Sequence, residues 1–154
     1  ETAYVTQDLD PRPYRPSDVA ACLAMFDGNV PQFFAATERA DFADFLRDHG
    51  DLPYLVIEQG GAVVACGGVD VTKGRGCLTW GMVDRNRQGQ GLGRVLTTAR
   101  LDLLRAQPEV REVAIETSQH TAGFYAGLGF KITRVTPDGF GPGLDRVDMV
   151  LPLR

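Results

Sequence analysis

The chain has 154 residues, of which 44% are hydrophobic, and a formal net charge of −4. This length favours a single globular domain over residues 1–154, and no apolar run approaches the roughly 20 residues that cross a bilayer. With a sequence pI of about 5.1, the chain is not expected to bind nucleic acid or membranes through broad charge attraction. Cys22, Cys66 and Cys77 lack metal-binding spacing and are expected to be reduced in a cytoplasmic protein.

The N-terminal third of the chain predicts two helices. Residues 1–11 are polar and are expected to be loosely held. Apolar side chains at helical spacing predict a first helix that ends near Gly28. A second helix is expected to follow a cap at Thr37 and to end at His49, where a histidine suits the negative end of the helix dipole. The apolar connector Val30–Phe34 would be either core packing or the wall of a pocket.

Three strands are predicted next, at residues 53–58, 62–71 and 77–83. Glycine-containing turns join them, which is typical of hairpins. This three-strand meander leads into a glycine-rich segment and then into a long helix that stops before Pro108.

The remaining chain predicts a strand at residues 110–117, a short helix from about 121 to 128, and closing strands at 130–135 and 147–153. The loop between the closing strands, residues 137–143, is rich in glycine and proline. Helices, meander, helix, strand, helix and hairpin in this order favour a mixed α/β fold around one sheet.

Three alternating glycines stand between the strand that ends at Val83 and the long helix: Gly89, Gly91 and Gly93. Glycines at such a junction let the backbone approach a ligand, and the helix start adds partial positive charge that suits a phosphate. Four arginines and no acid lie within residues 85–100: Arg85, Arg87, Arg94 and Arg100. The predicted apolar face of the helix consists of Leu92, Val95, Leu96, Ala99 and Leu103. The simpler alternative is a glycine-rich turn before an exposed basic helix.

Two common phosphate-binding motifs do not fit this spacing. A dinucleotide-binding loop needs a glycine three residues after Gly91, where Arg94 stands, and a P-loop needs a Gly-Lys-Ser/Thr triplet that the chain lacks. The remaining pattern is Gln88, two residues, Gly91, one residue and Gly93. It resembles the pyrophosphate loop of the GNAT acyltransferase superfamily, whose amides hold the pyrophosphate of acetyl-coenzyme A (acetyl-CoA).

A second stretch, from Tyr125 to Gly129 and Phe130, strengthens this resemblance, because many GNAT members carry tyrosine, three residues and Gly-Phe on a short helix. With the element order, the resemblance covers roughly residues 12–153. It implies a central mixed, mostly antiparallel sheet flanked by about four helices. By position, Tyr125 corresponds to the residue that protonates the departing CoA thiolate. The alternative role for Tyr125 is structural: a half-buried tyrosine whose hydroxyl binds a local group.

By the same correspondence, the predicted cofactor-binding residues are Met82, Val83, Gln88, Gly89, Gln90, Gly91, Leu92, Gly93, Arg94 and Ser118. Ser118 stands where many members have a cofactor-orienting asparagine, and either it or Gln119 could donate similarly. Some members carry a glutamate as general base near residues 75–77, where this chain has no carboxylate. The candidate bases are therefore Glu116, Asp70, Glu58 and His120, or a chain of water molecules.

The resemblance predicts an N-acetyltransferase that uses acetyl-CoA and no metal. The expected acceptor is a primary amine of a small molecule, held between Val30–Phe34 and Phe140–Leu144, which offer apolar side chains and tight turns. A peptide or protein N-acetyltransferase and a non-catalytic acyl-CoA-binding regulatory domain are the alternatives, and a homodimer is left open as the assembly.

Overall fold

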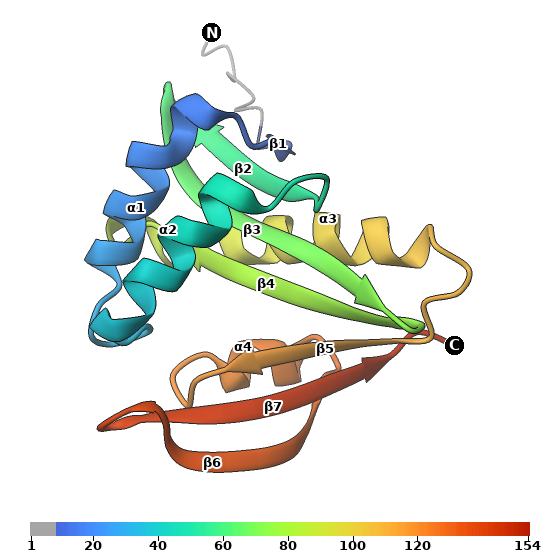
Figure 1. Cartoon of the computed structure of the whole chain (residues 1–154). Helices are drawn as coiled ribbons and strands as arrows, with labels where there is room; N and C mark the ends of the chain where they lie inside the picture. Colours follow the sequence, from blue (N-terminus) through green and yellow to red (C-terminus); the bar gives the residue numbers. More distant parts are fainter. Residues whose placement is uncertain (1–8) are drawn as a thin grey trace, which may run out of the picture.

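The computed structural model describes residues 9–154, which fold around one seven-stranded sheet (Figure 1). The strands are β1 (Arg12–Pro13), β2 (Tyr54–Gln59), β3 (Ala62–Thr72), β4 (Arg75–Val83), β5 (Glu112–Thr117), β6 (Lys131–Gly141) and β7 (Leu144–Pro152). The α-helices are α1 (Val19–Gly28), α2 (Arg39–Asp48), α3 (Leu92–Arg105) and α4 (Ala122–Gly127), with 3₁₀ turns at Pro16–Asp18, Ala36–Glu38 and Arg85–Arg87. The prediction that residues 1–11 are loosely held concerns mainly residues 1–8, which lie outside the described residues.

The strand order is β1-β2-β3-β4-β5-β7-β6, and the only parallel neighbours within this sheet of residues 12–152 are β4 and β5. Their pairing covers three residues of each strand, from Arg75 opposite Glu112 to Cys77 opposite Ala114. Beyond this point the two strands diverge (Figure 1). The sheet is therefore continuous at one end of β4 and open at the other. The predicted mixed, mostly antiparallel sheet with four α-helices is confirmed.

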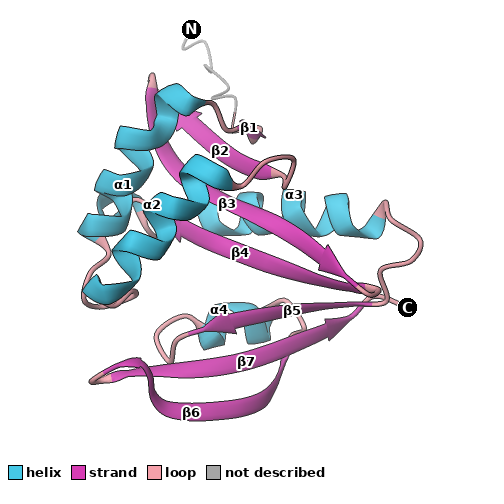
Figure 2. Ribbon diagram, in the orientation of Figure 1, coloured by secondary structure: helices cyan, strands magenta, loops and turns pink. Residues whose placement is uncertain are grey.

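Helices cover both faces of the β2–β4 part of the sheet (Figure 2). On one face, α1 and α2 bury Phe26 and Phe42 against strands β2 to β4. On the other face, the first half of α3 packs Leu92 and Leu96 against β2 and β3. Burial of one such large apolar side chain contributes about 1.5–3 kcal/mol, so this packing fixes α3 under the open half of β4.

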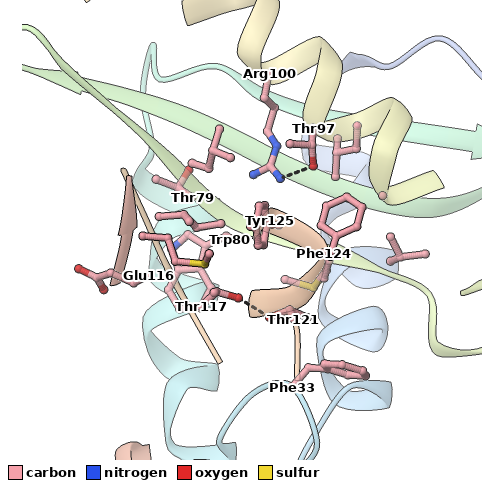
Figure 3. A pocket seen from close by; sticks show the side chains of 18 of the residues that line it. Phe33, Thr79, Trp80, Thr97, Arg100, Glu116, Thr117, Thr121, Phe124 and Tyr125 are labelled. Atoms are coloured by element: carbon pink, nitrogen blue, oxygen red, sulfur yellow. Dashed lines mark hydrogen bonds between the residues drawn. The ribbon is translucent and has the colours of Figure 1, made fainter. Parts of the chain in front are cut away.

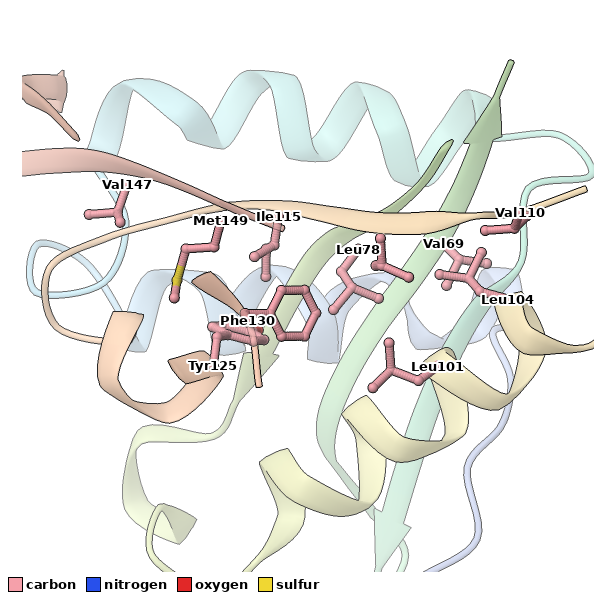
Figure 4. Packing of buried hydrophobic residues seen from close by; sticks show 11 residues of the cluster. Val69, Leu78, Leu101, Leu104, Val110, Ile115, Tyr125, Phe130, Val147 and Met149 are labelled. Atoms are coloured by element: carbon pink, nitrogen blue, oxygen red, sulfur yellow. The ribbon is translucent and has the colours of Figure 1, made fainter. Parts of the chain in front are cut away.

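The second half of α3 and the short helix α4 share a core with the C-terminal strands (Figure 4). In this cluster, Leu101 and Leu104 of α3 pack with Ile115 of β5 and Met149 of β7. Phe130, which lies just before β6, belongs to the same cluster. Because α3 contacts both halves of the diverging sheet, it holds β4 and β5 apart on a common support. None of the helices within residues 9–154 has the length and apolarity that crossing a membrane requires.

The predicted apolar face of α3 is wrong by about one residue. The buried positions are Leu92, Leu96, Thr97, Arg100, Leu101 and Leu104. Leu103 is 38% exposed. The buried face thus includes positions 97 and 100, which carry the polar side chains Thr97 and Arg100. A pattern that counts only apolar residues rotates the helix away from Thr97 and Arg100.

The predicted loop over residues 137–143 is also wrong. Strand β6 continues to Gly141 and forms a hairpin with β7, whose register shifts between Thr136 and Gly141. Asp138 and Gly141 take positive φ angles of 55° and 151° inside this strand. The turn-forming residues therefore belong to an irregular strand, in which the Asp138 amide donates a 2.9 Å hydrogen bond to the Asp145 carboxylate.

Candidate active site

A cavity of about 1120 Å³ occupies the space where β4 and β5 diverge. It extends from the glycine-rich segment past β4 to α4, the α1–α2 connector and the β6–β7 hairpin (Figure 3). Eight of the ten predicted cofactor-binding residues line it: Met82, Val83, Gln88, Gly89, Gly91, Leu92, Gly93 and Arg94. Gln90 and Ser118 do not line it.

The glycine-rich segment forms an open cradle at one end of the cavity. Gly89 and Gly91 have φ angles of 83° and 82°, a region that side chains rarely adopt, and no atom lies within 4 Å of where their Cβ atoms would be. Helix α3 begins at Leu92, and its first intrahelical amide bond runs from Val95 to Gly91. The preceding amides of the first turn are therefore free to bind an anion beside Arg94. This geometry fits a pyrophosphate.

Asn29 links the cradle to the rest of the fold. Its buried side-chain amide donates hydrogen bonds to the carbonyl oxygens of Met25, at 2.9 Å, and Val83, at 3.0 Å. Its Oδ1 atom accepts a hydrogen bond from Nε2 of Gln88 at 3.2 Å. Asn29 thus fixes the side chain of Gln88 and the end of β4 relative to α1. The sequence predicted only that the first helix ends near Gly28, and it gave Asn29 no role in the site.

The open half of β4 contains a local irregularity at Trp80. Trp80 has a φ angle of 43°, and the β3–β4 register shifts between Cys66 and Gly68. The Trp80 ring packs against Phe34 and Phe42, with ring centroids 6.3 Å and 5.0 Å apart, and its carbonyl oxygen accepts a 2.7 Å hydrogen bond from Tyr54. A left-handed non-glycine residue costs energy and persists only where surrounding contacts enforce it. Here aromatic packing holds β4 in the shape that lines the cavity.

Tyr125 lies on α4 at the same cavity, with an exposed fraction of 8%. Its ring packs edge-on against Phe124 and Phe130, at centroid distances of 5.1 Å and 5.6 Å. The ring is therefore held rigidly. No hydrogen bond of its hydroxyl to another group is found within residues 9–154. A tyrosine fixed by its ring with a free hydroxyl at a cavity wall suits proton donation.

Ser118 and Gln119 satisfy local backbone groups instead of facing the cavity. The Ser118 hydroxyl accepts a hydrogen bond from the His120 amide at 3.2 Å, and its carbonyl oxygen accepts from the amides that begin α4. Gln119 binds the β6–β7 hairpin, where Nε2 donates to the Gly143 carbonyl and Oε1 accepts from the Asp145 amide. These contacts place α4 and the hairpin.

The four candidate bases stand in different surroundings. Glu58 forms an ion pair with Arg12 and lies outside the cavity lining. Glu116, Asp70 and His120 line the cavity, and Glu116 forms a 2.9 Å ion pair with Arg146. The structure therefore brings three of the four candidates together at the site.

Glu38 is a further carboxylate at the cavity that sequence reasoning missed. Its Oε2 atom accepts a 2.9 Å hydrogen bond from the Ala35 amide, so Glu38, and not the predicted Thr37, caps the start of the second helical segment. Burial raises the pKa of Glu38, the Ala35 amide opposes this, and the charge of Glu116 adds to the rise. Glu38 thus caps a helix and is also a half-buried acid that lines the cavity.

Aromatic side chains from two segments form part of the cavity wall. Phe33 and Phe34 of the α1–α2 connector and Phe140 of the hairpin all line it. Phe33 lies edge-on to His120 at 6.1 Å and carries the Arg85 guanidinium 5.6 Å above its ring. Of the two predicted acceptor walls, Val30–Phe34 therefore contributes two residues to the cavity lining, and Phe140–Leu144 contributes Phe140.

The comparisons with known proteins agree with this architecture. The family model described as "Acetyltransferase (GNAT) domain" matches residues 23–153. The comparison with curated protein sequences gives no match.

Solved structures share the fold at low sequence identity. The ribosomal-protein-S18-alanine N-acetyltransferase from Escherichia coli has a TM-score of 0.77 and 21% identity, over 93% of this chain and 92% of its own. The yncA protein from Salmonella typhimurium, solved with its cofactor acetyl-CoA, has a TM-score of 0.74 and 20% identity over 96% and 95%.

The Rv2747 protein from Mycobacterium tuberculosis, in complex with CoA, has a TM-score of 0.68 and 21% identity over 92% and 98%. At these identities the neighbours show the fold, while the family model covers most of the chain. The chain belongs to the GNAT acetyltransferase family.

Proposed function

We propose that this protein transfers the acetyl group of acetyl-CoA to the primary amine of a small molecule. The observation that carries the proposal is one cavity with an anion-binding cradle at one end, at Gly89–Arg94, and the free hydroxyl of Tyr125 further in. The open halves of β4 and β5 bound the space between them. An extended, amide-containing cofactor arm suits such a space, because its amides can bind the open edge of β4.

The chemistry needs positioning and two proton transfers. The neutral amine attacks the thioester carbonyl, a C–N bond forms, and the C–S bond breaks. The proton that the amine loses passes to water, and Tyr125 supplies a proton to the departing thiolate. A well-placed acid typically contributes about 10²–10⁴-fold to such a step. Since a thioester is already activated, orientation within the cavity can supply much of the remainder.

The acceptor wall favours a cationic amine. Glu38, Asp70 and Glu116 line the cavity, so three carboxylates gather at this wall. An ammonium group near these carboxylates would be attracted before it loses its proton. The aromatic side chains of Phe33 and Phe140 would exclude bulk water from a small acceptor.

The cofactor assignment is tested by Gly91→Glu, with Gly61→Glu as the control. Gly91 and Gly61 both have φ angles of 82°, and neither has an atom within 4 Å of its Cβ position. The two substitutions therefore impose similar backbone strain, but only Gly91 lies at the cradle. Calorimetry should show that Gly91→Glu abolishes acetyl-CoA binding and that Gly61→Glu keeps it. Unchanged affinity in folded Gly91→Glu would refute the assignment.

The acceptor class is tested by CoA release. Amines, polyamines, amino acids, aminoglycosides and peptides should be screened with acetyl-CoA at a fixed concentration. The expected outcome is turnover with a small primary amine. Activity confined to long peptides would overturn the small-molecule assignment and support a peptide N-acetyltransferase.

A further inference from the structure

A buried guanidinium on α3 has no acidic partner among the described residues 9–154. Arg100 has an exposed fraction of 1% and is among the largest fully buried side chains. Its hydrogen bonds are long: Nη1 to the Gly68 carbonyl oxygen at 3.5 Å and Nη2 to Oγ1 of Thr97 at 3.4 Å. Its Nε atom has no partner, and no ion pair of Arg100 is found within residues 9–154. The charge is therefore poorly compensated.

The sheet is shaped to admit this side chain. A Cβ atom at Gly81 would lie 2.8 Å from Nη1 and Nη2 of Arg100, and one at Gly67 would lie 3.1 Å from its Cζ. Two glycines on adjacent strands thus provide the space that the guanidinium occupies. Figure 3 shows the guanidinium directed away from α3 toward the part of the cavity that holds Tyr125. Arg100 lines the same cavity as Tyr125.

Arg100 also lies at a defined depth in the cavity. The cradle is at the start of α3, and Arg100 is more than two helical turns further along the same helix. On β4, its neighbour Gly81 lies inward of Met82 and Val83, the predicted contacts of the cofactor arm. Under the proposed function, this depth belongs to the acyl end of the cofactor and not to its phosphates.

A buried guanidinium without a counter-charge is costly, and a carboxylate compensates it best. Guanidinium and carboxylate groups form charge-assisted, often bidentate hydrogen bonds, and Nε of Arg100 is free to take part. A neutral acetyl group offers one carbonyl oxygen and leaves the charge uncompensated. The pocket thus has a feature that an acetyl group does not use.

We propose that Arg100 makes the acyl pocket selective for an acidic acyl group, so that the protein takes short dicarboxylic acyl-CoA thioesters such as malonyl-CoA or succinyl-CoA. This inference rests on the proposed use of acyl-CoA. Transfer of such an acyl group makes and breaks the same bonds as acetyl transfer: one C–N bond forms, one C–S bond breaks, and the thiolate gains a proton. A carboxylate on the acceptor amine is the other source of the same chemistry. The acyl source is favoured because Arg100 lies on the helix that begins at the cradle, whereas Glu38, Phe33 and Phe140 form the acceptor walls.

The test is calorimetry of acyl-CoA binding in the absence of any amine. Wild-type protein should bind malonyl-CoA or succinyl-CoA at least about tenfold more tightly than acetyl-CoA, as expected for hydrogen bonds between charged groups. Arg100→Met should lose this preference and keep acetyl-CoA affinity within about threefold, because no charged bond to acetyl is removed. Arg105→Met removes an exposed arginine from the same helix and should keep the preference.

Each other outcome has a distinct meaning. Equal binding of the three thioesters by the wild-type protein, or a preference that persists in Arg100→Met, overturns the inference and leaves the proposed acetyl transfer intact. Binding of succinyl-CoA without acetyl-CoA supports the inference and overturns acetyl-CoA as the donor. If Arg100→Met instead alters only the discrimination between an amino acid and its decarboxylated amine, the carboxylate comes from the acceptor and the inference is overturned.

Discussion

Replacement of Arg100 by methionine should stabilise the ligand-free protein. Methionine has an unbranched, flexible side chain that can follow the path of the arginine side chain and pack in irregular space. The substitution removes the buried charge. The bonds that would be lost are long, at 3.5 Å to Gly68 and 3.4 Å to Thr97, and Nε has no bond to lose. Bonds at the outer limit of hydrogen-bond distance contribute little.

The expected gain follows from the charge that is no longer buried. Replacement of buried ionic groups by apolar ones of similar volume is often neutral or stabilising by about 1–4 kcal/mol. For a chain of 154 residues, an unfolding entropy near 2.1 cal/mol/K per residue makes 1 kcal/mol equivalent to about 3 °C in Tm. Arg100→Met should therefore raise Tm by about 3–12 °C.

Differential scanning calorimetry of the ligand-free protein measures this shift. Arg105→Met is the matched control, because Arg105 is half exposed and its 3.8 Å ion pair with Asp102 contributes little. Its Tm should stay within about 2 °C of the wild-type value. A Tm for Arg100→Met that falls clearly below the control would show instead that the guanidinium is well compensated in the folded protein.

Three further outcomes are expected. Tyr125→Phe should lower turnover by about 10²-fold or more with acetyl-CoA affinity nearly unchanged, and equal turnover under rate-limiting chemistry would return Tyr125 to a structural role. With the best amine, kcat/KM should keep rising from pH 6 to 10 in both wild type and Glu116→Gln, following the ionisation of the amine; a plateau near neutrality that disappears in the variant would show Glu116 to be a dedicated base. The hydrogen bonds of Arg12, opposed by burial, lower the pKa of Asp18, so its contribution to stability is present at neutral pH and is lost as the pH falls through the lowered value. Asp18→Asn should therefore destabilise the protein by about 1–3 kcal/mol at pH 7 and by less at pH 3, as measured by urea unfolding at both pH values.

The parts of the site that could be predicted depend on local sequence. Gly89 and Gly91 mark a turn because their φ angles exclude other residues, and this requirement is visible in the spacing of the glycines. Tyr125 could be placed on a short helix because Tyr125, Gly129 and Phe130 resemble a pattern that many GNAT members carry there. The order of helices and strands was likewise readable from hydrophobic periodicity, which reports the environment of each segment separately.

The missed residues owe their positions to contacts between distant segments. Asn29 joins the site through Val83, 54 positions further along the chain, and Glu38 joins it through the packing of the α1–α2 connector. Arg100 looked like one more exposed arginine of a basic helix. Its burial depends on Gly67 and Gly81, which belong to strands that the helix pattern does not contain.

The diverging strands leave the protein with two open edges inside its own sheet. An exposed edge normally invites a strand from another molecule, and many proteins guard against this with charges, prolines or very short edge strands. Beyond Cys77 and Ala114, the edges of β4 and β5 instead face each other across the cavity. A foreign polypeptide would have to thread its side chains between α3, α4 and the aromatic walls to reach them. The fold thus leaves unpaired main-chain N–H and C=O groups accessible to a narrow ligand. The surrounding helices and aromatic side chains keep strands of other molecules from pairing with them.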